Sequence, residues 1–250
     1  MEALRVEDLC KEFGAVHVLQ NVSFSVETGE LLAIIGPNGA GKTTLFNILD
    51  GQLEPSAGRV IFYEQDVTHL ASYSRAHLGM ARSFQLTTLF LDLTVLDNVM
   101  LAFHGNSRSR FQMFRPITSY AYLYDKAHRL LERINLWEKR DELVAEISYG
   151  EQRKLEITVS MASNPKLLLL DEPNAGLTAA ETKDIGTLIR DLGIDATVLV
   201  VAHDMDFVFN IAKRIIVLHN GQIITEGTCD EIRYDLRVKE LYTGIEANAT

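Results

Sequence analysis

The sequence lacks most features of secreted, disulfide-stabilised or membrane-spanning proteins. Its cysteines, Cys10 and Cys229, are too few and too isolated for a disulfide framework or a zinc site, so buried or incidental thiols are expected. The longest strongly apolar stretches, such as 166–170 and 197–202, are far shorter than the roughly 20 residues that cross a bilayer. Residues 1–5 contain no basic segment before an apolar core, so we expect no secretory signal and a chain that stays in the cytoplasm.

Positive charge is also scarce. The chain has 24 Lys and Arg residues against 34 Asp and Glu residues, a formal net charge of −10, which argues against general nucleic-acid binding but leaves room for a local basic patch. With 250 residues, 47% of them hydrophobic, the chain can bury one substantial core with a smaller subdomain attached.

Apolar runs alternate with helix-like segments along much of the chain. The predicted strands are 31–35, 167–170 and 197–202, and the predicted helices are 42 to about 50 and 179–192. Near-continuous apolar strands separated by helices are typical of a mainly parallel sheet covered on both faces. The predicted fold class is therefore α/β.

Other stretches favour antiparallel pairing. Residues 4–9 and 22–26 are short and β-rich, and they predict a small antiparallel sheet before the α/β core. Strands 215–218 and 223–225 flank Asn220-Gly221, which predicts a hairpin.

A mainly helical stretch interrupts the α/β pattern between about residues 89 and 140, with helical spacing of apolar positions in 95–103 and 120–134. We expect a helical subdomain, about 89–163, inserted into a single domain that spans 1–250. Segment 106–115 is basic and contains aromatic residues, so it could contact lipid headgroups or a partner. A solvated loop with its aromatics tucked inward fits equally well.

One segment matches the phosphate-binding loop G-x-x-x-x-G-K-[ST] at every fixed position. It lies between a predicted strand and a predicted helix, and it reads Gly36-Pro37-Asn38-Gly39-Ala40-Gly41-Lys42-Thr43, followed by Thr44. The glycines let backbone N–H groups turn toward phosphate oxygens, Lys42 can reach the β- and γ-phosphates, and the Thr43 hydroxyl can ligate Mg²⁺. The positive end of the following helix adds to the attraction. The chain is expected to bind a nucleoside triphosphate.

A second element of a nucleotide site is the pair Asp171-Glu172, which ends an apolar strand. Ligands in such sheets lie at the carboxyl ends of the strands. Asp171 is placed to hold Mg²⁺, directly or through water, and Glu172 to act as a base that polarises the attacking water. Two carboxylates after a run of leucines often only mark a strand end in solvent, but a complete phosphate loop in the same chain strengthens the nucleotide interpretation.

Three further elements narrow the choice, although each is weak alone. Gln85 follows a predicted strand, and His203 ends the strand that comes after Asp171-Glu172. Between them, Ser148 and Gly150 precede a helix-like stretch that runs to Glu156. A helix N-terminus with free N–H groups attracts an anion.

In this order and spacing, the motifs resemble those of the ATP-binding-cassette (ABC) ATPases, and the resemblance covers essentially the whole chain. It implies that Gln85 senses Mg²⁺ and the γ-phosphate and joins the core to the helical subdomain. His203 then contacts the γ-phosphate, and Phe13 stacks on adenine, although a core phenylalanine is indistinguishable in sequence. Ser148 and Gly150 bind the γ-phosphate of ATP held by the opposite protomer, so two subunits pair head to tail around two ATP molecules.

These expectations define the candidate site. The catalytic residues are Glu172 and His203. The Mg²⁺ ligands are Thr43, Gln85 and Asp171. The ATP-binding residues are Phe13, Gly36, Pro37, Asn38, Gly39, Ala40, Gly41, Lys42, Thr43, Thr44, Gln85, Ser148, Gly150 and Asp171.

Two departures from the commonest ABC pattern point to one subfamily. Tyr149 and Glu151 replace a usual glycine and glutamine, and Thr178 replaces a usual aspartate, which puts a carboxylate contact across the dimer interface in question. The subfamily is that of the ATP-binding subunits of branched-chain amino-acid importers, which this chain resembles in Phe84 to Val95, Ser148 to Ile157, Asp171 to Leu177 and His203 to Met205. The long stretch Phe103 to Tyr124 suits the larger of the two ATPase subunits that such importers usually have. The resemblance implies that the chain binds integral-membrane permease subunits and a second ATPase subunit, which is either another copy or a sister chain. It also implies an indirect partnership with a substrate-binding protein and peripheral attachment to the cytoplasmic face of the membrane.

We expect residues 85–98 to contact the permeases, because this segment has more apolar residues than a surface loop needs: Leu89, Phe90, Leu91 and Leu93. Packing of the same residues inside the helical subdomain explains them equally well, and both can hold at once. Alternatives within the family are amide or urea import and lipid or lipopolysaccharide export. A soluble ABC protein that acts on ribosomes or DNA usually has two cassettes or a long coiled-coil insertion, and this sequence shows neither. A nucleotide kinase is also less favoured, because it would leave Ser148 to Glu156 and His203 without a role.

Overall fold

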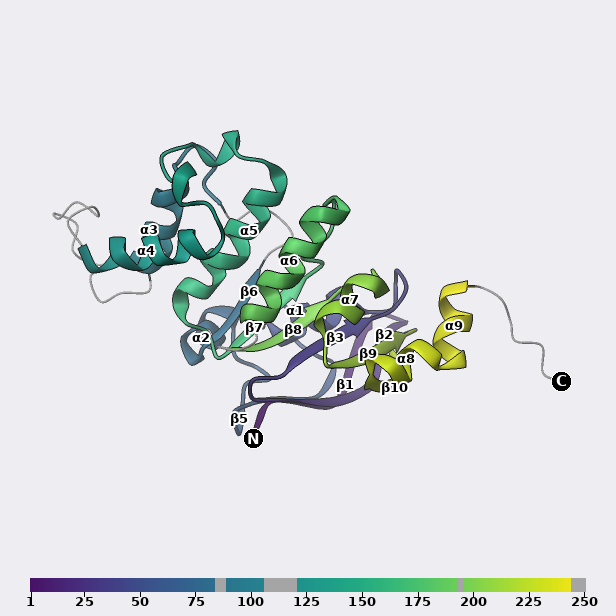
Figure 1. Cartoon of the computed structure of the whole chain (residues 1–250). Helices are drawn as coiled ribbons and strands as arrows, with labels where there is room; N and C mark the ends of the chain where they lie inside the picture. Colours follow the sequence, from purple (N-terminus) through teal and green to yellow (C-terminus); the bar gives the residue numbers. More distant parts are fainter. Residues whose placement is uncertain (84–88, 106–120, 193–195, 244–250) are drawn as a thin grey trace.

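A six-stranded sheet forms the centre of the molecule in the computed structural model, which describes residues 1–83, 89–105, 121–192 and 196–243 (Figure 1). The strand order is β10-β9-β3-β8-β7-β6, and all neighbours are parallel except the β9–β10 hairpin. The strands are β3 (Leu31–Ile35), β6 (Met80–Ser83), β7 (Leu167–Asp171), β8 (Thr197–Val201), β9 (Arg214–His219) and β10 (Gln222–Thr228).

Both faces of this sheet are buried, which explains why its inner strands are apolar without interruption. In β3, Leu32 and Ile34 pack into one core, whereas Leu31, Ala33 and Ile35 pack into a second core on the other face. The strands β7 and β8 divide their side chains in the same alternating way, as period-two side-chain direction requires.

A second, antiparallel sheet has the order β2-β1-β4-β5. Its strands are β1 (Glu2–Phe13), β2 (Val16–Glu27), β4 (Ala57–Phe62) and β5 (Gln65–Asp66). The predicted stretches 4–9 and 22–26 therefore lie inside much longer strands. Register shifts and positive φ angles at Asp8 and Asn21 interrupt the alternation that sequence reasoning depends on, so the outer parts of both strands were not predicted.

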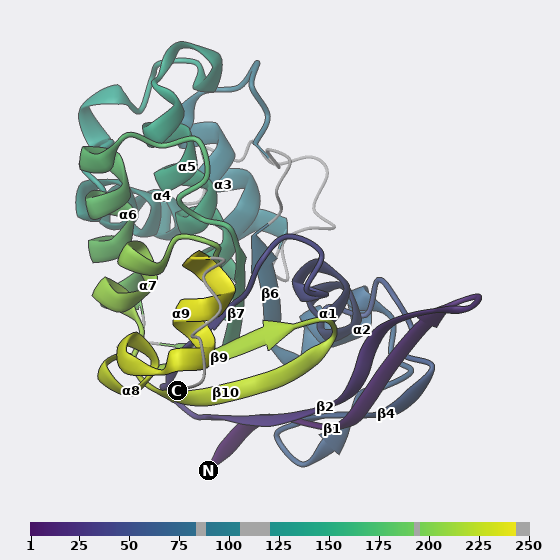
Figure 2. The ribbon, with the colours of Figure 1, turned by 90° about the vertical axis from the view of Figure 1, so that its right-hand side faces the viewer.

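Helices cover the central sheet on both sides (Figure 2). Helices α5, α6 and α7 contribute to the core on one face, and α1 packs with the antiparallel sheet on the other. The helices among the described residues are α1 (Lys42–Leu49), α2 (Ser72–Leu78), α3 (Val95–Gly105), α4 (Ala121–Arg133), α5 (Tyr149–Ser160), α6 (Ala179–Leu192), α7 (Met205–Ile211), α8 (Cys229–Tyr234) and α9 (Leu236–Thr243).

The chain between β6 and β7 contributes α3, α4 and α5, and in Figure 1 these helices lie together at the end of the molecule farthest from α9. The predicted helices 95–103 and 120–134 correspond to α3 and α4. Along the described residues, no helix combines the length and apolarity needed to span a bilayer.

The α/β class, with a mainly parallel sheet and an N-terminal antiparallel sheet, is confirmed. Sequence reasoning did not identify β4, β5, α2, α7, α8 or α9. These elements are short or mostly exposed, so they show little periodicity on which a prediction could rest.

Candidate nucleotide site

The candidate site forms where three parallel strands end at one edge of the sheet. The phosphate loop follows β3, Asp171 ends β7 with Glu172 directly after it, and His203 follows β8, which lies between β3 and β7. Parallel strands place their carboxyl ends together, and such edges are where α/β proteins bind ligands. Elements separated by more than a hundred residues in the chain thus meet in space.

The phosphate loop encloses a pocket of 210 Å³. Its lining consists of Val18, Asn38, Gly39, Ala40, Gly41, Lys42, Thr43, Thr44 and Glu172. Gly41 is the N-cap of α1 with φ +104°, a left-handed conformation that suits glycine, and a Cβ there would lie 2.8 Å from Leu19 Cδ2. The free N–H groups at the start of α1 therefore face a concave space suited to phosphate oxygens.

Lys42 folds back over the loop that precedes it. Its Nζ donates to the carbonyl oxygens of Gly36 at 2.7 Å and Pro37 at 3.0 Å. Burial lowers the pKa of the Lys42 amine, and the nearby carboxylates of Glu172 and Asp171 oppose that shift. The ammonium thus stands between the loop and two acidic groups, where a phosphate can exchange with the carbonyl acceptors.

Asp171 is almost fully buried, and among the residues that the structure describes one of its carboxylate oxygens has no partner. Oδ2 accepts a 2.8 Å hydrogen bond from Arg82, whereas Oδ1 is buried and meets no donor from that part of the chain. Burial raises the pKa of Asp171, and Arg82 opposes the rise. An unpaired buried acceptor is costly, so Oδ1 fits the Mg²⁺ expected from the sequence, or a water that ligates it.

Among the residues that the structure describes, no group of three or more His, Cys, Asp or Glu side chains is arranged to hold a metal ion. This finding is compatible with Mg²⁺ at the site, because Mg²⁺ in nucleotide sites usually takes one or two protein groups and completes its shell with phosphate and water oxygens.

Glu172 and His203 lie side by side at the site. His203 Nδ1 lies 3.3 Å from Glu172 Oε1, and the Glu172 backbone N–H donates to the Val201 carbonyl at 2.8 Å. The loops that carry the pair are joined by a 3.1 Å hydrogen bond from Asn174 Nδ2 to Asp204 Oδ2. Glu172 lines the phosphate pocket, so the predicted base lies beside the predicted phosphate site.

The N-terminus of α5 carries the predicted Ser148 and Gly150. Ser148 is the N-cap, its Oγ accepts from the Glu151 N–H at 3.3 Å, and Glu151 accepts from the Ser148 N–H at 2.9 Å. Tyr149, one of the departures noted above, lies over the loop after β7, since a Cβ at Gly176 would stand 3.3 Å from its ring. Neither Ser148 nor Gly150 lines the phosphate pocket of the same chain.

A carboxylate from α6 lies against the start of α5. Glu181 accepts from the Thr178 N–H at 2.9 Å and from the Thr178 hydroxyl at 2.7 Å, and a Cβ on Gly150 would stand 2.3 Å from Glu181 Oε1. Hydrogen bonds from the Thr178 hydroxyl and N–H, together with one from the Gly150 N–H, lower the pKa of Glu181. Thr178, the second departure, thus forms a capping box with Glu181.

Replacing Glu181 with glutamine is expected to lower thermal stability in a pH-dependent way. Because the folded state depresses the pKa of Glu181, its carboxylate contributes stability above the ordinary value of 4.5, and that contribution is lost as the pH falls below it. The difference in Tm between wild type and Glu181→Gln should therefore be present at neutral pH and shrink in acid. The exposed Glu138→Gln is the control, and a difference that stays constant from neutral pH down to below 4.5 would contradict the prediction.

The structure shows neither of the remaining predicted ATP-binding residues, Phe13 and Gln85, at the phosphate pocket: Phe13 lies outside its lining, and Gln85 is not among the described residues. Phe13 ends β1 and is 51% exposed, with Lys11 Nζ 5.0 Å from its ring centroid; it does not line the phosphate pocket, although β2 contributes Val18 to it. Gln85 lies outside the described residues, as does segment 106–115. Their roles stay predictions.

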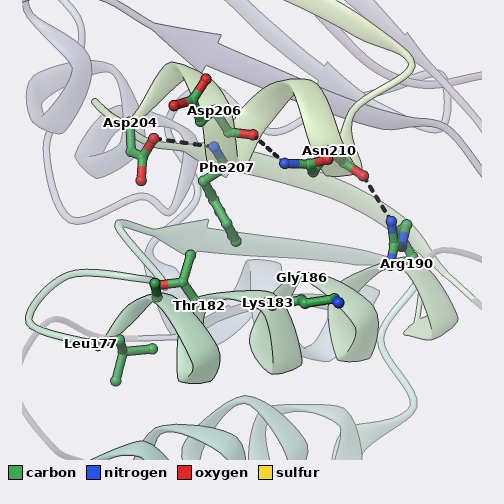
Figure 3. A pocket seen from close by; sticks show the side chains of 10 residues that line it. Leu177, Thr182, Lys183, Gly186, Arg190, Asp204, Asp206, Phe207 and Asn210 are labelled. Atoms are coloured by element: carbon green, nitrogen blue, oxygen red, sulfur yellow. Dashed lines mark hydrogen bonds between the residues drawn. The ribbon is translucent and has the colours of Figure 1, made fainter.

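A larger pocket of 630 Å³ lies between α6 and α7 (Figure 3). Phe207 points into the space between the helices, beside Gly186. The polar groups of this pocket bond mainly to one another: Asp204 Oδ1 accepts from the Phe207 N–H, and Arg190 donates to the Asn210 carbonyl. The phosphate pocket is smaller, yet its lining includes a lysine, a carboxylate and the start of α1, so we assign the chemistry there.

Two buried arginines beside the site were not identified from the sequence. Arg82 on β6 bridges Asp171 and Asn47, with both hydrogen bonds at 2.8 Å. Arg153 on α5 contacts the backbone that follows β7. The sequence feature that could have identified Arg82 is a charged residue at the end of a short predicted strand. Its partner Asp171 could not be predicted, because the contact depends on the parallel pairing of β6 with β7, which a single sequence does not reveal.

Comparisons with known proteins agree with this geometry. Residues 19–175 match a protein-family model described as ABC transporter. The high-affinity branched-chain amino acid transport ATP-binding protein LivG of Salmonella typhimurium is 37% identical over 250 residues, which cover 96% of this chain and 97% of LivG. The lipopolysaccharide export system ATP-binding protein LptB of Haemophilus influenzae is 33% identical over 245 residues, 98% of each chain. The solved ADP conformation of an ATP-binding cassette of an ABC transporter is similar with a TM-score of 0.85 and 33% identity, covering 98% of this chain and 100% of that one.

Proposed function

The chain belongs to the ABC transporter family, and from that premise we propose that it is the ATP-hydrolysing subunit of a branched-chain amino-acid importer, driving separate permease subunits. The observation that carries the proposal is the meeting of the phosphate loop, the buried Asp171 and the Glu172–His203 pair at one sheet edge. The similarity to LivG over nearly the full chain supports the choice of substrate class.

In this proposal the phosphate loop binds ATP. Backbone N–H groups between Gly39 and Thr44 surround the phosphates, and Lys42 exchanges its carbonyl acceptors for β- and γ-phosphate oxygens. Thr43, Asp171 and Gln85 are the residues that would hold Mg²⁺, which neutralises phosphate charge. Phe13 would stack on the adenine.

Hydrolysis requires a water in line with the bond between the γ-phosphorus and ADP. Glu172 orients this water and accepts its proton as the water oxygen bonds to phosphorus, while the bond to the leaving ADP oxygen breaks. Lys42 and His203 stabilise the charge that develops on the phosphoryl oxygens. The 3.3 Å contact between His203 and Glu172 keeps both groups on the same side of the site.

The site needs a second subunit to be complete. Ser148 and Gly150 do not line their own chain's phosphate pocket, so we assign them to ATP held by a partner cassette. Their N–H groups, which bond to Glu151 and Glu181 in this chain, would exchange those carboxylates for phosphate oxygens. Such a dimer buries two ATP molecules between its subunits. The partner is either a second copy of this chain or a sister ATPase.

The permeases would dock at the cytoplasmic membrane face on the region that begins near Phe90. Phe90 is 60% exposed and Leu91 is 44% exposed. Both backbone polar groups of Phe90 bond to the buried Asn98, whose Oδ1 accepts from the N–H at 2.8 Å and whose Nδ2 donates to the carbonyl at 3.0 Å. The apolar residue is therefore held in an exposed position. We also propose that residues 89–163 move as a subdomain with this surface.

Replacing Phe90 with aspartate is expected to abolish stimulation of ATP hydrolysis by the permeases and to leave the basal rate unchanged. A charge at this position would be desolvated in an apolar contact, which is costly. The measurement is ATPase activity with the permeases in proteoliposomes and without them. Tyr73→Asp, at a 72% exposed aromatic on α2, is the matched control, and undiminished stimulation of the Phe90 variant would exclude this surface.

Lipopolysaccharide export is the second candidate, because LptB is also similar over the full chain. Amide and urea import are further possibilities within the importer group. The same assay separates them: stimulation by amino-acid permeases, and dependence on a binding protein loaded with leucine, favours the proposal, whereas stimulation by lipid-export permeases alone would reject it.

A further inference from the structure

Arg153 lies in the second turn of α5 and is bonded to the backbone of another element. Its Nε donates to the Pro173 carbonyl, and its Nη2 donates to the carbonyls of Asp171 and Glu172, all at 3.0 Å. Its side chain is only 6% exposed. One guanidinium therefore holds three consecutive carbonyls where β7 ends and the catalytic loop begins.

The local backbone explains why these carbonyls accept from a donor outside the sheet, although the Glu172 carbonyl also accepts from the Ala175 N–H at 3.1 Å. Glu172 has φ +45°, so the chain leaves the extended conformation and the carbonyls after β7 no longer fit a sheet ladder. A buried carbonyl without a donor costs free energy comparable to a lost hydrogen bond. The fork of Arg153 supplies these donors from outside the sheet.

The charge of Arg153 is balanced within α5. Its Nη1 donates to Glu156 Oε2 at 2.7 Å, and the Glu156 side chain is 3% exposed. Burial raises the pKa of Glu156, and the neighbouring Arg153 opposes that rise. The pair costs desolvation and is weak evidence for stability, so its placement calls for another explanation.

The way the Glu172 backbone is held explains why Arg153 and Glu156 are buried at this place. The Glu172 N–H donates to Val201, and the Glu172 carbonyl accepts from Arg153 and from the Ala175 N–H, so both peptide groups that aim the Glu172 side chain are fixed. The same α5 begins at Ser148, which the proposed function assigns to the partner's ATP. A shift of α5 thus moves the guanidinium that fixes the catalytic loop.

We propose that Arg153 is a positioning residue that holds Glu172 in its geometry for hydrolysis and couples it to α5, so that phosphate bound at the α5 N-terminus acts on the chain's own active site. This inference rests on the proposed function. Arg153 acts through Glu172 and does not contact ATP.

The chain contains a matched control in Arg75, which is 1% exposed. Its guanidinium donates to the carbonyls of Leu70, Ile48, Leu49 and Thr68, so it shares the burial and the type of contact of Arg153. These carbonyls lie at the end of α1 and beside α2 and do not line the phosphate pocket. Loss of Arg75 should reduce stability without acting on Glu172.

The test compares Arg153→Met, Arg153→Lys and Arg75→Lys for ATP Kd, kcat and Tm. For Arg153→Met we expect kcat to fall about 100-fold, as for a small misplacement of a reacting group, while ATP Kd stays unchanged. Arg153→Lys should recover only part of the rate, because an ammonium lacks the rigid planar fork with which the guanidinium reaches the three carbonyls at once. Arg75→Lys should lower Tm and keep the kcat of the folded fraction.

A double variant separates positioning from general damage. If Arg153 acts through Glu172, adding Arg153→Met to Glu172→Gln lowers the residual rate no further, since groups that act as a unit are not additive. A multiplicative loss, a wild-type kcat in Arg153→Met, or an equal kcat loss in Arg75→Lys would overturn the inference. A wild-type protein that binds no ATP or hydrolyses none would instead overturn the proposed function.

Discussion

Glu172→Gln is expected to lose most ATP turnover and to retain ATP binding. The amide has nearly the shape of the carboxylate and can still orient a water, but it cannot accept the proton that the attacking water releases. Loss of a general base lowers kcat by about 100-fold or more. Binding is preserved because the phosphate loop and Lys42 are unchanged, and the loss should therefore appear in kcat rather than in ATP Kd.

The same variant reports the assembly. With hydrolysis blocked, Mg-ATP should hold two cassettes together, so light scattering after gel filtration should give twice the monomer mass with Mg-ATP and the monomer mass without it. Glu54→Gln, at an exposed carboxylate outside the pocket, should behave as wild type. Near-normal hydrolysis by the Glu172 variant would remove Glu172 from the catalytic role, and an ATP-bound monomer would point to an obligatory sister ATPase or permease.

Gly36→Ala is expected to destroy ATP binding and to destabilise the fold. A Cβ at this position would lie 2.1 Å from the carbonyl oxygen of Leu218 and 3.2 Å from the Ala40 Cβ. Leu218 belongs to β9, whose backbone is held between β3 and β10, so the phosphate loop must give way instead. Overpacking of this kind costs about 1–3 kcal/mol, and it displaces the Gly36 carbonyl that anchors Lys42.

Equilibrium ATP titration and thermal unfolding check this expectation. The matched control is Gly105→Ala at the end of α3, where a Cβ would meet no atom of the described residues within 4 Å. That substitution should leave ATP Kd unchanged and raise Tm slightly, because alanine is the better helix former. Wild-type affinity in Gly36→Ala would mean that the loop and β9 accommodate one another more easily than their spacing implies.

Local sequence patterns predicted the central features well. The loop from Gly36 to Thr43 and the Asp171-Glu172 pair are contiguous motifs, so their chemistry can be predicted without knowledge of the tertiary structure. The buried strands are uniformly apolar because both of their faces are covered, which makes them visible in one sequence. Strands β1 and β2 were only partly predicted, because bulges break their alternation.

Contacts between distant segments could not be predicted in this way. Arg82 meets Asp171 because β6 pairs in parallel with β7, and Arg153 meets the loop after β7 because α5 packs across that strand end. Neither partner is near its arginine in the chain. The contact of Glu181 with Gly150 likewise depends on where α6 lies against α5.

The sequence by itself determined the α/β class, the nucleotide loop and the family, since each rests on residues adjacent in the chain or on a periodicity that burial imposes. Tertiary structure alone decided how Asp171 and Glu172 are held, which oxygen of Asp171 is left without a donor, and that one guanidinium links α5 to the catalytic loop. The physical reason is that hydrogen bonding and burial depend on distances in space, and the packing of the helices on the sheet sets those distances.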